Sequence, residues 1–176
     1  MSVRNSIIAA IVLLVGLPLA AIILFWNMPR ASGVSTSDGH GQIVGINSYK
    51  LYDPASRLGA RLTQDYHRST EYKKPVSLTI GGRQYTTDMI FECKDGEVVS
   101  LGFNLEVPFS DTAPGPRQVE FLLLRGLQRE YRGFVGYKKN PDQYVYYDKR
   151  NNIISLGVYN DFVCLRVIAE GHEAGV

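Results

Sequence analysis

Two patterns of hydrophobic residues divide this chain: one continuous run near the start, then short segments in which apolar and polar residues alternate. The run extends from Ile7 to Trp26 without a charge. Its twenty residues, in a helix that rises about 1.5 Å per residue, would span about 30 Å, the thickness of a bilayer's hydrocarbon core. The pattern therefore predicts a transmembrane helix within an anchor of residues 1–26. Gly16 and Ala20 form a small-xxx-small pair that would let a second helix approach.

The charges that flank the run predict its orientation. Arg4 and the N-terminal amine precede it, Arg30 follows it, and the next basic residue is Lys50. This slight bias favours a single-pass inner-membrane protein with a cytoplasmic N-terminus and a periplasmic or extracytoplasmic C-terminal domain. A cleaved signal peptide ending near Ala31 is the alternative. The usual apolar region of a signal peptide has only about 7 to 15 residues, so we favour a retained signal anchor.

The composition changes after the run. Residues 27–42 are rich in Ser and Gly and almost free of large apolar residues, which is typical of a flexible linker. Residues 43–169 are long enough for one compact domain with its own core. By composition, residues 170–176 form a tail. The expected order is anchor, linker, exported domain and tail.

The first periodic segment of the domain predicts a helix. Asp53-Pro54 would supply a capping side chain and a proline at the first helical position. Apolar residues then recur every four positions through about Arg68, and Pro75 would end the element. These residues are Leu58, Leu62 and Tyr66.

Four short strands are predicted to follow. Gly81-Gly82 and Asp95-Gly96 are two-residue turn signals that accept positive φ, so each predicts a β-hairpin. The expected strands are Val76 to Ile80, Arg83 to Thr87, Met89 to Lys94 and Glu97 to Phe103.

A second amphipathic helix is predicted over Arg117 to Tyr131. Its apolar side would hold Val119, Leu122, Leu123, Gly126 and Leu127, and its polar side Arg117, Arg125, Gln128, Arg129 and Arg132. The run Phe121 to Leu124 could instead be a buried strand.

Three more strands are expected to complete the domain. They are Gln143 to Asp148, Ile153 to Tyr159 and Asp161 to Ala169. Runs of strands separated by helices predict an α+β fold, an antiparallel sheet covered on one face by about two helices.

The charges are distributed unevenly, although the formal net charge is only +2. Residues 117–150 carry eight basic and four acidic side chains, and residues 75–116 carry two basic and six acidic ones. The basic segment also contains tyrosines, which are enriched at protein interfaces. We therefore expect a partner-binding face formed by Tyr137, Lys138, Lys139, Tyr144, Lys149 and Arg150. Strand alternation would send Tyr144 and Tyr146 to one face, so part of the cluster belongs to the core.

The sequence contains no signature of catalysis. It has three histidines, of which His40 lies in the linker and His172 in the tail, and His67 is expected near a helix end. Neither a metal-binding, a nucleotide-binding nor a nucleophile-elbow motif is present. We therefore expect no enzyme, cofactor or metal, although carboxylate chemistry at Glu92 or Glu106 stays open. Residues 31–176 carry 17 basic and 17 acidic side chains, and this formally neutral exported part argues against nucleic acid as a partner.

The two cysteines, Cys93 and Cys164, both fall in predicted strands. Export would place them in an oxidising compartment, which favours a disulfide that closes a long loop. Two isolated buried thiols are the alternative.

These features define three functional hypotheses. The first is a membrane-anchored bacterial envelope protein whose exported domain binds a protein or cell-wall partner as an accessory component of an assembly. The second is a membrane-tethered inhibitor or immunity protein that blocks an exported toxin or hydrolase with a loop such as Ser110 to Pro116 or Lys138 to Gln143. The third, given the least weight, is an envelope hydrolase.

Overall fold

The computed structural model describes residues 33–59, 65–66, 69–109, 113–131, 137–140 and 143–172. The chain divides into two units, Met1–Arg30 and Ala31–Val176. All described residues belong to the second unit, and the fold below is the fold of that unit.

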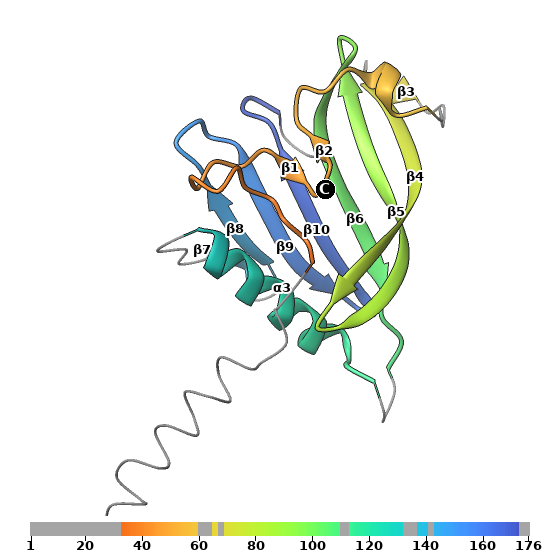
Figure 1. Ribbon diagram of the computed structural model, residues 1–176, viewed down its shortest axis with the longest axis vertical. Helices are drawn as coiled ribbons and strands as arrows, with labels where there is room; N and C mark the ends of the chain where they lie inside the picture. Colours follow the sequence, from red (N-terminus) through yellow and green to blue (C-terminus); the bar gives the residue numbers. More distant parts are fainter. Residues whose placement is uncertain are drawn as a thin grey trace, which may run out of the picture. The chain divides into compact units, whose positions relative to one another are not determined.

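Within the described residues, eight strands form one antiparallel sheet in the order β3-β4-β5-β6-β10-β9-β8-β7, and two short strands form a separate ribbon (Figure 1). The strands are β1 (Gly45–Ile46), β2 (Tyr49–Lys50), β3 (Asp65–Tyr66), β4 (Ser69–Ile80), β5 (Arg83–Lys94), β6 (Glu97–Glu106), β7 (Tyr137–Asn140), β8 (Gln143–Tyr147), β9 (Ile153–Tyr159) and β10 (Phe162–Ile168). The helical elements are a 3₁₀ turn, η2 (Ala55–Arg57), and one α-helix, α3 (Pro116–Glu130).

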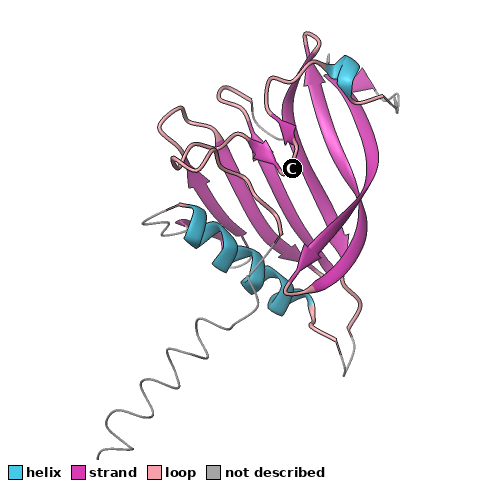
Figure 2. Ribbon diagram, viewed as in Figure 1, coloured by secondary structure: helices cyan, strands magenta, loops and turns pink. Residues whose placement is uncertain are grey.

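The large sheet consists of two consecutive meanders, β3 to β6 and β7 to β10, which meet where β6 pairs with β10. Gly81-Gly82 and Asp95-Gly96 close the hairpins of the first meander, and all four residues have positive φ. Such turns match the right-handed twist of paired strands. The twist curves the sheet strongly, as Figure 2 shows.

One face of the sheet contains the core. Across the central strands, Phe103 of β6 lies opposite both Met89 of β5 and Leu165 of β10. All three are buried, because alternate residues of a strand point to the same face. Helix α3 and the segment from Gly33 to Leu58 both pack onto this face, and the three parts share one hydrophobic cluster.

Helix α3 presents one apolar side to the sheet. Val119, Leu123 and Leu127 recur every four residues and are all buried. Pro116 begins the helix, a position where its missing N–H costs no hydrogen bond. Leu122 packs against Gly81 at the β4–β5 turn, where a Cβ would lie 2.6 Å from its Cδ1 atom.

Hydrogen bonds hold the N-terminal part of the described chain against the end of α3. The Thr36 backbone N–H donates to Glu130 Oε2 at 2.8 Å, and the Thr36 hydroxyl lies 2.9 Å from both Glu130 Oε2 and the Tyr131 hydroxyl. Val34 and Thr36 are buried. Val34 and Thr36, which were expected to belong to a linker, are therefore packed into the fold.

The predicted fold class, with about two helices over a sheet, is wrong. The described residues form a mostly β structure with α3 as their one α-helix. The first predicted helix is instead the three-residue turn η2. Leu58 is the C-cap of this turn, and the next residue, Gly59, has a left-handed φ of +77°, a conformation that commonly ends helices. Leu58 is buried in the core, and β3 contains Tyr66.

Pro75 also behaves differently from expectation, because β4 continues through it. The Gly33 N–H donates to the Thr79 carbonyl on the side of β4 away from β5. The backbone groups of residue 75, four positions earlier, point to the same side. Among the described residues, β3 pairs with β4 only at Ser69 and Thr70, so a proline at position 75 costs no ladder hydrogen bond. The strand β5 is likewise continuous where two strands were expected.

Other element predictions are confirmed. The helix predicted over Arg117 to Tyr131 is α3, and both glycine-containing hairpin turns are present. The predicted strands near the C-terminus correspond to β8, β9 and β10. In these places the local pattern and the tertiary packing favour the same structure.

The membrane predictions need correction. Along the part of the chain that the structure describes, no helix has the length and apolar character needed to cross a bilayer. The structure thus does not support a transmembrane helix, a signal anchor or the single-pass inner-membrane localisation. The run from Ile7 to Trp26, with Gly16 and Ala20, lies outside the described residues.

Candidate functional site

Exposed aromatic side chains gather where β6 ends, α3 begins and β9 turns into β10. Phe109 is 79% exposed, Phe121 is 53% exposed and Tyr159 is 45% exposed. Phe109 follows β6, Phe121 lies in the second turn of α3, and Tyr159 is the last residue of β9. A group of exposed aromatic side chains is unusual on a protein surface that binds no partner. We therefore take this end of the fold as the candidate site.

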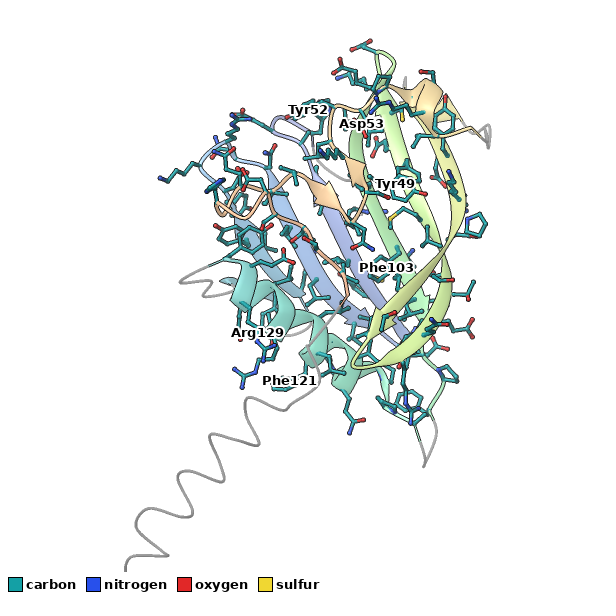
Figure 3. All side chains as sticks on the ribbon, viewed as in Figure 1. Tyr49, Tyr52, Asp53, Phe103, Phe121 and Arg129 are labelled. Atoms are coloured by element: carbon teal, nitrogen blue, oxygen red, sulfur yellow. The ribbon has the colours of Figure 1, made fainter. Side chains whose placement is uncertain are left out.

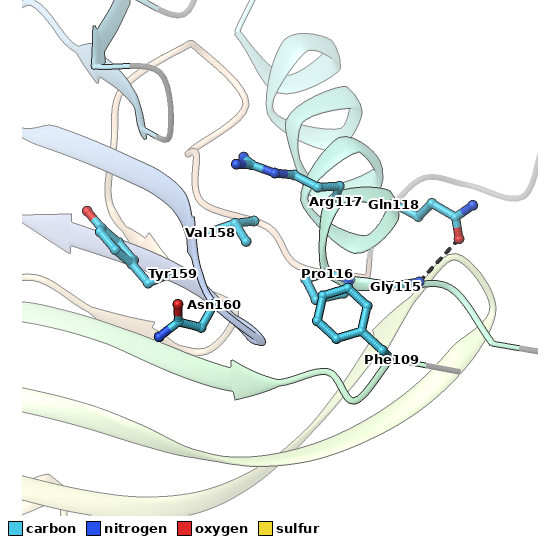
Figure 4. Close-up of a pocket in the computed structure, with 8 residues that line it drawn as sticks. All are labelled: Phe109, Gly115, Pro116, Arg117, Gln118, Val158, Tyr159 and Asn160. Atoms are coloured by element: carbon cyan, nitrogen blue, oxygen red, sulfur yellow. Dashed lines mark hydrogen bonds between the residues drawn. The ribbon is translucent and has the colours of Figure 1, made fainter. Parts of the chain in front are cut away.

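A cleft of about 520 Å³ lies at the N-terminal end of α3. We call it the α3 cleft, and it is lined by Phe109, Gly115, Pro116, Arg117, Gln118, Val158, Tyr159 and Asn160 (Figure 4). Its walls come from both meanders and from the helix between them. The Gly115 N–H donates to the Gln118 side-chain oxygen at 3.3 Å, which fixes the backbone where the helix begins.

A second hollow, of about 400 Å³, lies beside the cleft. We call it the α3 groove, and it is lined by Pro114, Arg117, Gln118, Phe121 and Leu122. Arg117 and Gln118 line both hollows. One segment of a partner could therefore fill both hollows across these two side chains.

Arginines surround the hollows on the helix side. Arg117 Nη1 lies 3.2 Å from Glu120 Oε2, and the Glu120 side chain is only 8% exposed. The guanidinium of Arg125 lies 5.4 Å from the ring centroid of Phe121, within the range of a cation–π interaction. Figure 3 labels Phe121 and Arg129 on the side of α3 away from the sheet. The exposed side of the helix is thus both cationic and aromatic.

Of the six sequence-predicted partner-binding residues, the structure describes the side chains of Tyr144, Lys149 and Arg150. Tyr144 is partly buried against the core. Lys149 and Arg150 are exposed in the β8–β9 turn, at the opposite end of β8 from the α3 cleft. Tyr137, Lys138 and Lys139 lie on the edge strand β7, and their side chains are outside the described residues.

The β8–β9 turn is held by a buried carboxylate. Asp148 Oδ1 accepts the backbone N–H groups of Arg150 and Asn152 at 2.8 and 2.9 Å. Its Oδ2 accepts the Ile43 N–H at 3.0 Å and the Asn152 side-chain amide at 3.1 Å. Four donors satisfy this carboxylate, so its role is to anchor the turn and the N-terminal segment.

Cys93 and Cys164 are both free thiols, so the expected disulfide is not formed. Cys93 lies opposite Val98 of β6, and Cys164 lies opposite Asn104, six residues further along the same strand. That offset alone is about 20 Å, whereas a disulfide requires Cα atoms within about 7 Å. Burial raises the pKa of Cys93 to about 11 and also raises that of Cys164, so both stay protonated at neutral pH.

Among the described side chains, no group of three or more His, Cys, Asp or Glu residues could hold a metal ion. Burial raises the pKa of the Tyr131 hydroxyl well above its ordinary value, and this hydroxyl contacts Thr36 in the core. His67 is outside the described residues.

The sequence offered Gly115 and Pro116 as part of the candidate loop Ser110 to Pro116, but it did not predict the α3 cleft, because the lining residues come from parts of the chain far apart in sequence. One signal was available in the sequence. Phe109 directly follows Pro108 and precedes a turn-rich stretch, so it lies outside the predicted strands and helices, whose packing would bury an aromatic side chain. The arginines of α3 were predicted to face solvent, and they do so at Arg117 and Arg129.

Comparison of the chain with protein-family models, with curated proteins and with solved structures gives no match.

Proposed function

We propose that this chain is a non-enzymatic protein-binding module whose α3 cleft receives a large apolar side chain of a partner protein. The observation that carries the proposal is Phe109, which is 79% exposed at the rim of the cleft. Transfer of an exposed aromatic ring from water to an apolar environment is favourable by roughly 2 kcal/mol. A partner that covers the Phe109 ring would gain this free energy on binding.

The composition of the surroundings supports this proposal. Aromatic residues and arginine are enriched in protein interfaces, and lysine is depleted. Tyr159 and Arg117 line the cleft together with Phe109, and lysine is absent from its lining. The cleft is also partly preformed by the Gly115–Gln118 hydrogen bond, so less ordering is needed on binding.

A peptide-display selection tests the proposal. The full-length chain is immobilised, a random twelve-residue library is panned against it, and the affinities of enriched peptides are measured by fluorescence anisotropy. We expect enriched peptides to contain a large apolar residue. Phe109→Ser should weaken binding at least about tenfold, as truncation of a central interface residue does.

Gly115→Leu provides a second variant, which adds a large side chain at a residue that lines the cleft. A Cβ at Gly115 meets no atom within 4 Å, and its φ of −75° suits any residue. Binding should again fall about tenfold while the fold is retained. The matched control is Tyr147→Ser, since Tyr147 is 53% exposed on β8, away from the cleft. Failure to enrich any peptide, or affinities unchanged by both cleft variants, would refute the proposal.

A further inference from the structure

The exposed side of α3 carries a row of residues that the proposed function does not yet use. We call Arg117, Phe121, Arg125 and Arg129 the α3 ridge. Their four-residue spacing places them along one side of the helix, because four residues advance about 400° around the axis. The ridge extends for about 18 Å, starting at the hollows.

We infer that the partner segment held at the α3 cleft is acidic and lies along the α3 ridge. This inference rests on the proposed function and adds the chemistry of the ligand. The charge of the helix surface supports this inference. A cationic surface attracts an anionic segment and disfavours binding of basic segments.

Of the two acidic residues of α3, Glu120 offsets the charge of Arg117, and Glu130 is engaged by Thr36. Glu120 is buried and directed to Arg117, at 3.2 Å. Glu130 points to the other side of the helix, where its carboxylate accepts two hydrogen bonds from Thr36. Beyond the Arg117–Glu120 pair, Arg125, Arg129 and the Phe121 ring therefore give the α3 ridge its cationic and aromatic character.

The ridge favours an acidic protein segment over nucleic acid. Its arginines adjoin the α3 groove, in which Pro114, Phe121 and Leu122 offer apolar contacts. Apolar hollows beside cations suit a peptide that has both apolar and carboxylate side chains. A nucleic-acid surface would instead need a wider excess of basic residues than a chain of net charge +2 provides.

The length of the ridge sets the size of the ligand. A span of about 18 Å is covered by five or six residues of extended chain, at about 3.3 Å each. Bidentate pairing with carboxylates would orient such a segment along the three guanidinium groups. The expected ligand is a short peptide with a large apolar residue at one end and several Asp or Glu residues after it.

The test uses three display libraries of twelve-residue peptides, doped with acidic, neutral or basic residues, panned against the full-length chain. Peptides from the acidic library should dominate, and their affinity should fall at least tenfold with Arg125→Glu and Arg129→Glu together. Arg125→Gln with Arg129→Gln removes the charges without reversing them and should cause a smaller loss. Raising salt from 50 to 300 mM should weaken wild-type binding, because exposed charges are screened.

The control is Lys149→Glu with Arg150→Glu, which makes the same change in net charge at the β8–β9 turn and should alter affinity less than twofold. Circular dichroism and thermal midpoints verify that each variant is folded. Peptides without acidic bias that bind independently of Arg125 and Arg129, yet require Phe109, would overturn this inference and leave the proposed function standing. Loss of binding only in the β8–β9 variant would overturn it as well. A twelve-nucleotide single strand that binds the ridge more tightly than any peptide would also overturn it.

Discussion

At the scale of single residues, buried polar groups fix parts of the chain that are distant in sequence. Asp148 joins the β8–β9 turn to Ile43, and Thr36 joins the N-terminal segment to Glu130 and Tyr131. Each contact spans more than ninety positions of sequence. A buried acceptor with several donors stabilises the native state mainly because its loss leaves the donors unpaired.

Asp148→Ala should therefore lower the free energy of unfolding by about 2 to 4 kcal/mol, since four donors lose their acceptor and three of these hydrogen bonds are buried. Urea denaturation of the variant and the wild type measures the difference. Asp95→Asn, at an exposed turn position of positive φ that Asn tolerates, is the control and should change stability by less than about 0.5 kcal/mol. An equal effect of both substitutions would contradict the anchoring role.

Cys93 gives a prediction about pH. Burial raises its pKa to about 11 in the folded chain, above the ordinary thiol value of 9.0. Between these values the unfolded chain loses the proton first, so stability should fall as pH rises from about 9 to 11, by at most about 1.4 kcal/mol per pH unit. Cys93→Ala should have a shallower decline in urea denaturation over this range. Parallel declines in the two proteins would contradict the assignment.

At the scale of elements, β4 shows how one residue protects an exposed stretch of strand edge. Among the described residues, β3 pairs with β4 only at Ser69 and Thr70, so the side of β4 away from β5 has no strand partner at Pro75. Pro75 lies in mid-strand and offers no N–H on the side away from β5. Natural sheets commonly use proline and charged residues on edge strands to prevent pairing with a second sheet.

Pro75→Thr should consequently promote association between chains, because it restores a donor on an exposed edge. Light scattering over time at equal protein concentration should increase faster for this variant than for the wild type. Ser77→Thr is the control, since residue 77 lies on the same edge and already has its N–H. Equal scattering in all three proteins would show that Pro75 does not protect the edge.

The elements also show which parts of the fold a sequence can reveal. Gly81-Gly82 and Asp95-Gly96 were found because a two-residue turn is decided by local backbone conformation. The α3 helix was found because its apolar side has a regular period. The prediction of a helix after Asp53 was wrong, because it rested on only three apolar residues at four-residue spacing. Gly59 has a left-handed conformation, and Leu58 is buried in a core formed by distant strands, and neither effect is visible in the local pattern.

At the scale of the whole molecule, the candidate site could not be predicted from the sequence, because it also depends on contacts between distant parts of the chain. The pattern indicated exposed arginines on α3, but not that Phe109, Arg117 and Tyr159 would line one cleft. Their proximity depends on the pairing of β6 with β10, which joins residues about sixty positions apart. Local periodicity contains no information about such pairings.

That central pairing gives a prediction of its own. A Cβ at Gly102 would lie 2.4 Å from the Leu165 carbonyl oxygen on β10, too close for any side chain without a shift of the backbone. Gly102→Ala should destabilise the fold by about 2 to 4 kcal/mol in urea denaturation. Gly96→Ala, where a Cβ meets no atom within 4 Å, is the comparison and tests the smaller cost of positive φ alone. A variant at Gly102 no less stable than that at Gly96 would contradict the close approach.

The order of the two meanders has a consequence for reassembly. Each meander is contiguous in sequence, and α3 lies between them in the chain. A chain divided between Phe109 and Ala113 would yield one fragment ending in a wall of the α3 cleft and another carrying the remaining lining residues. Neither fragment has the whole cleft, so recovery of peptide binding on mixing would report complementation of the two halves across the β6–β10 seam.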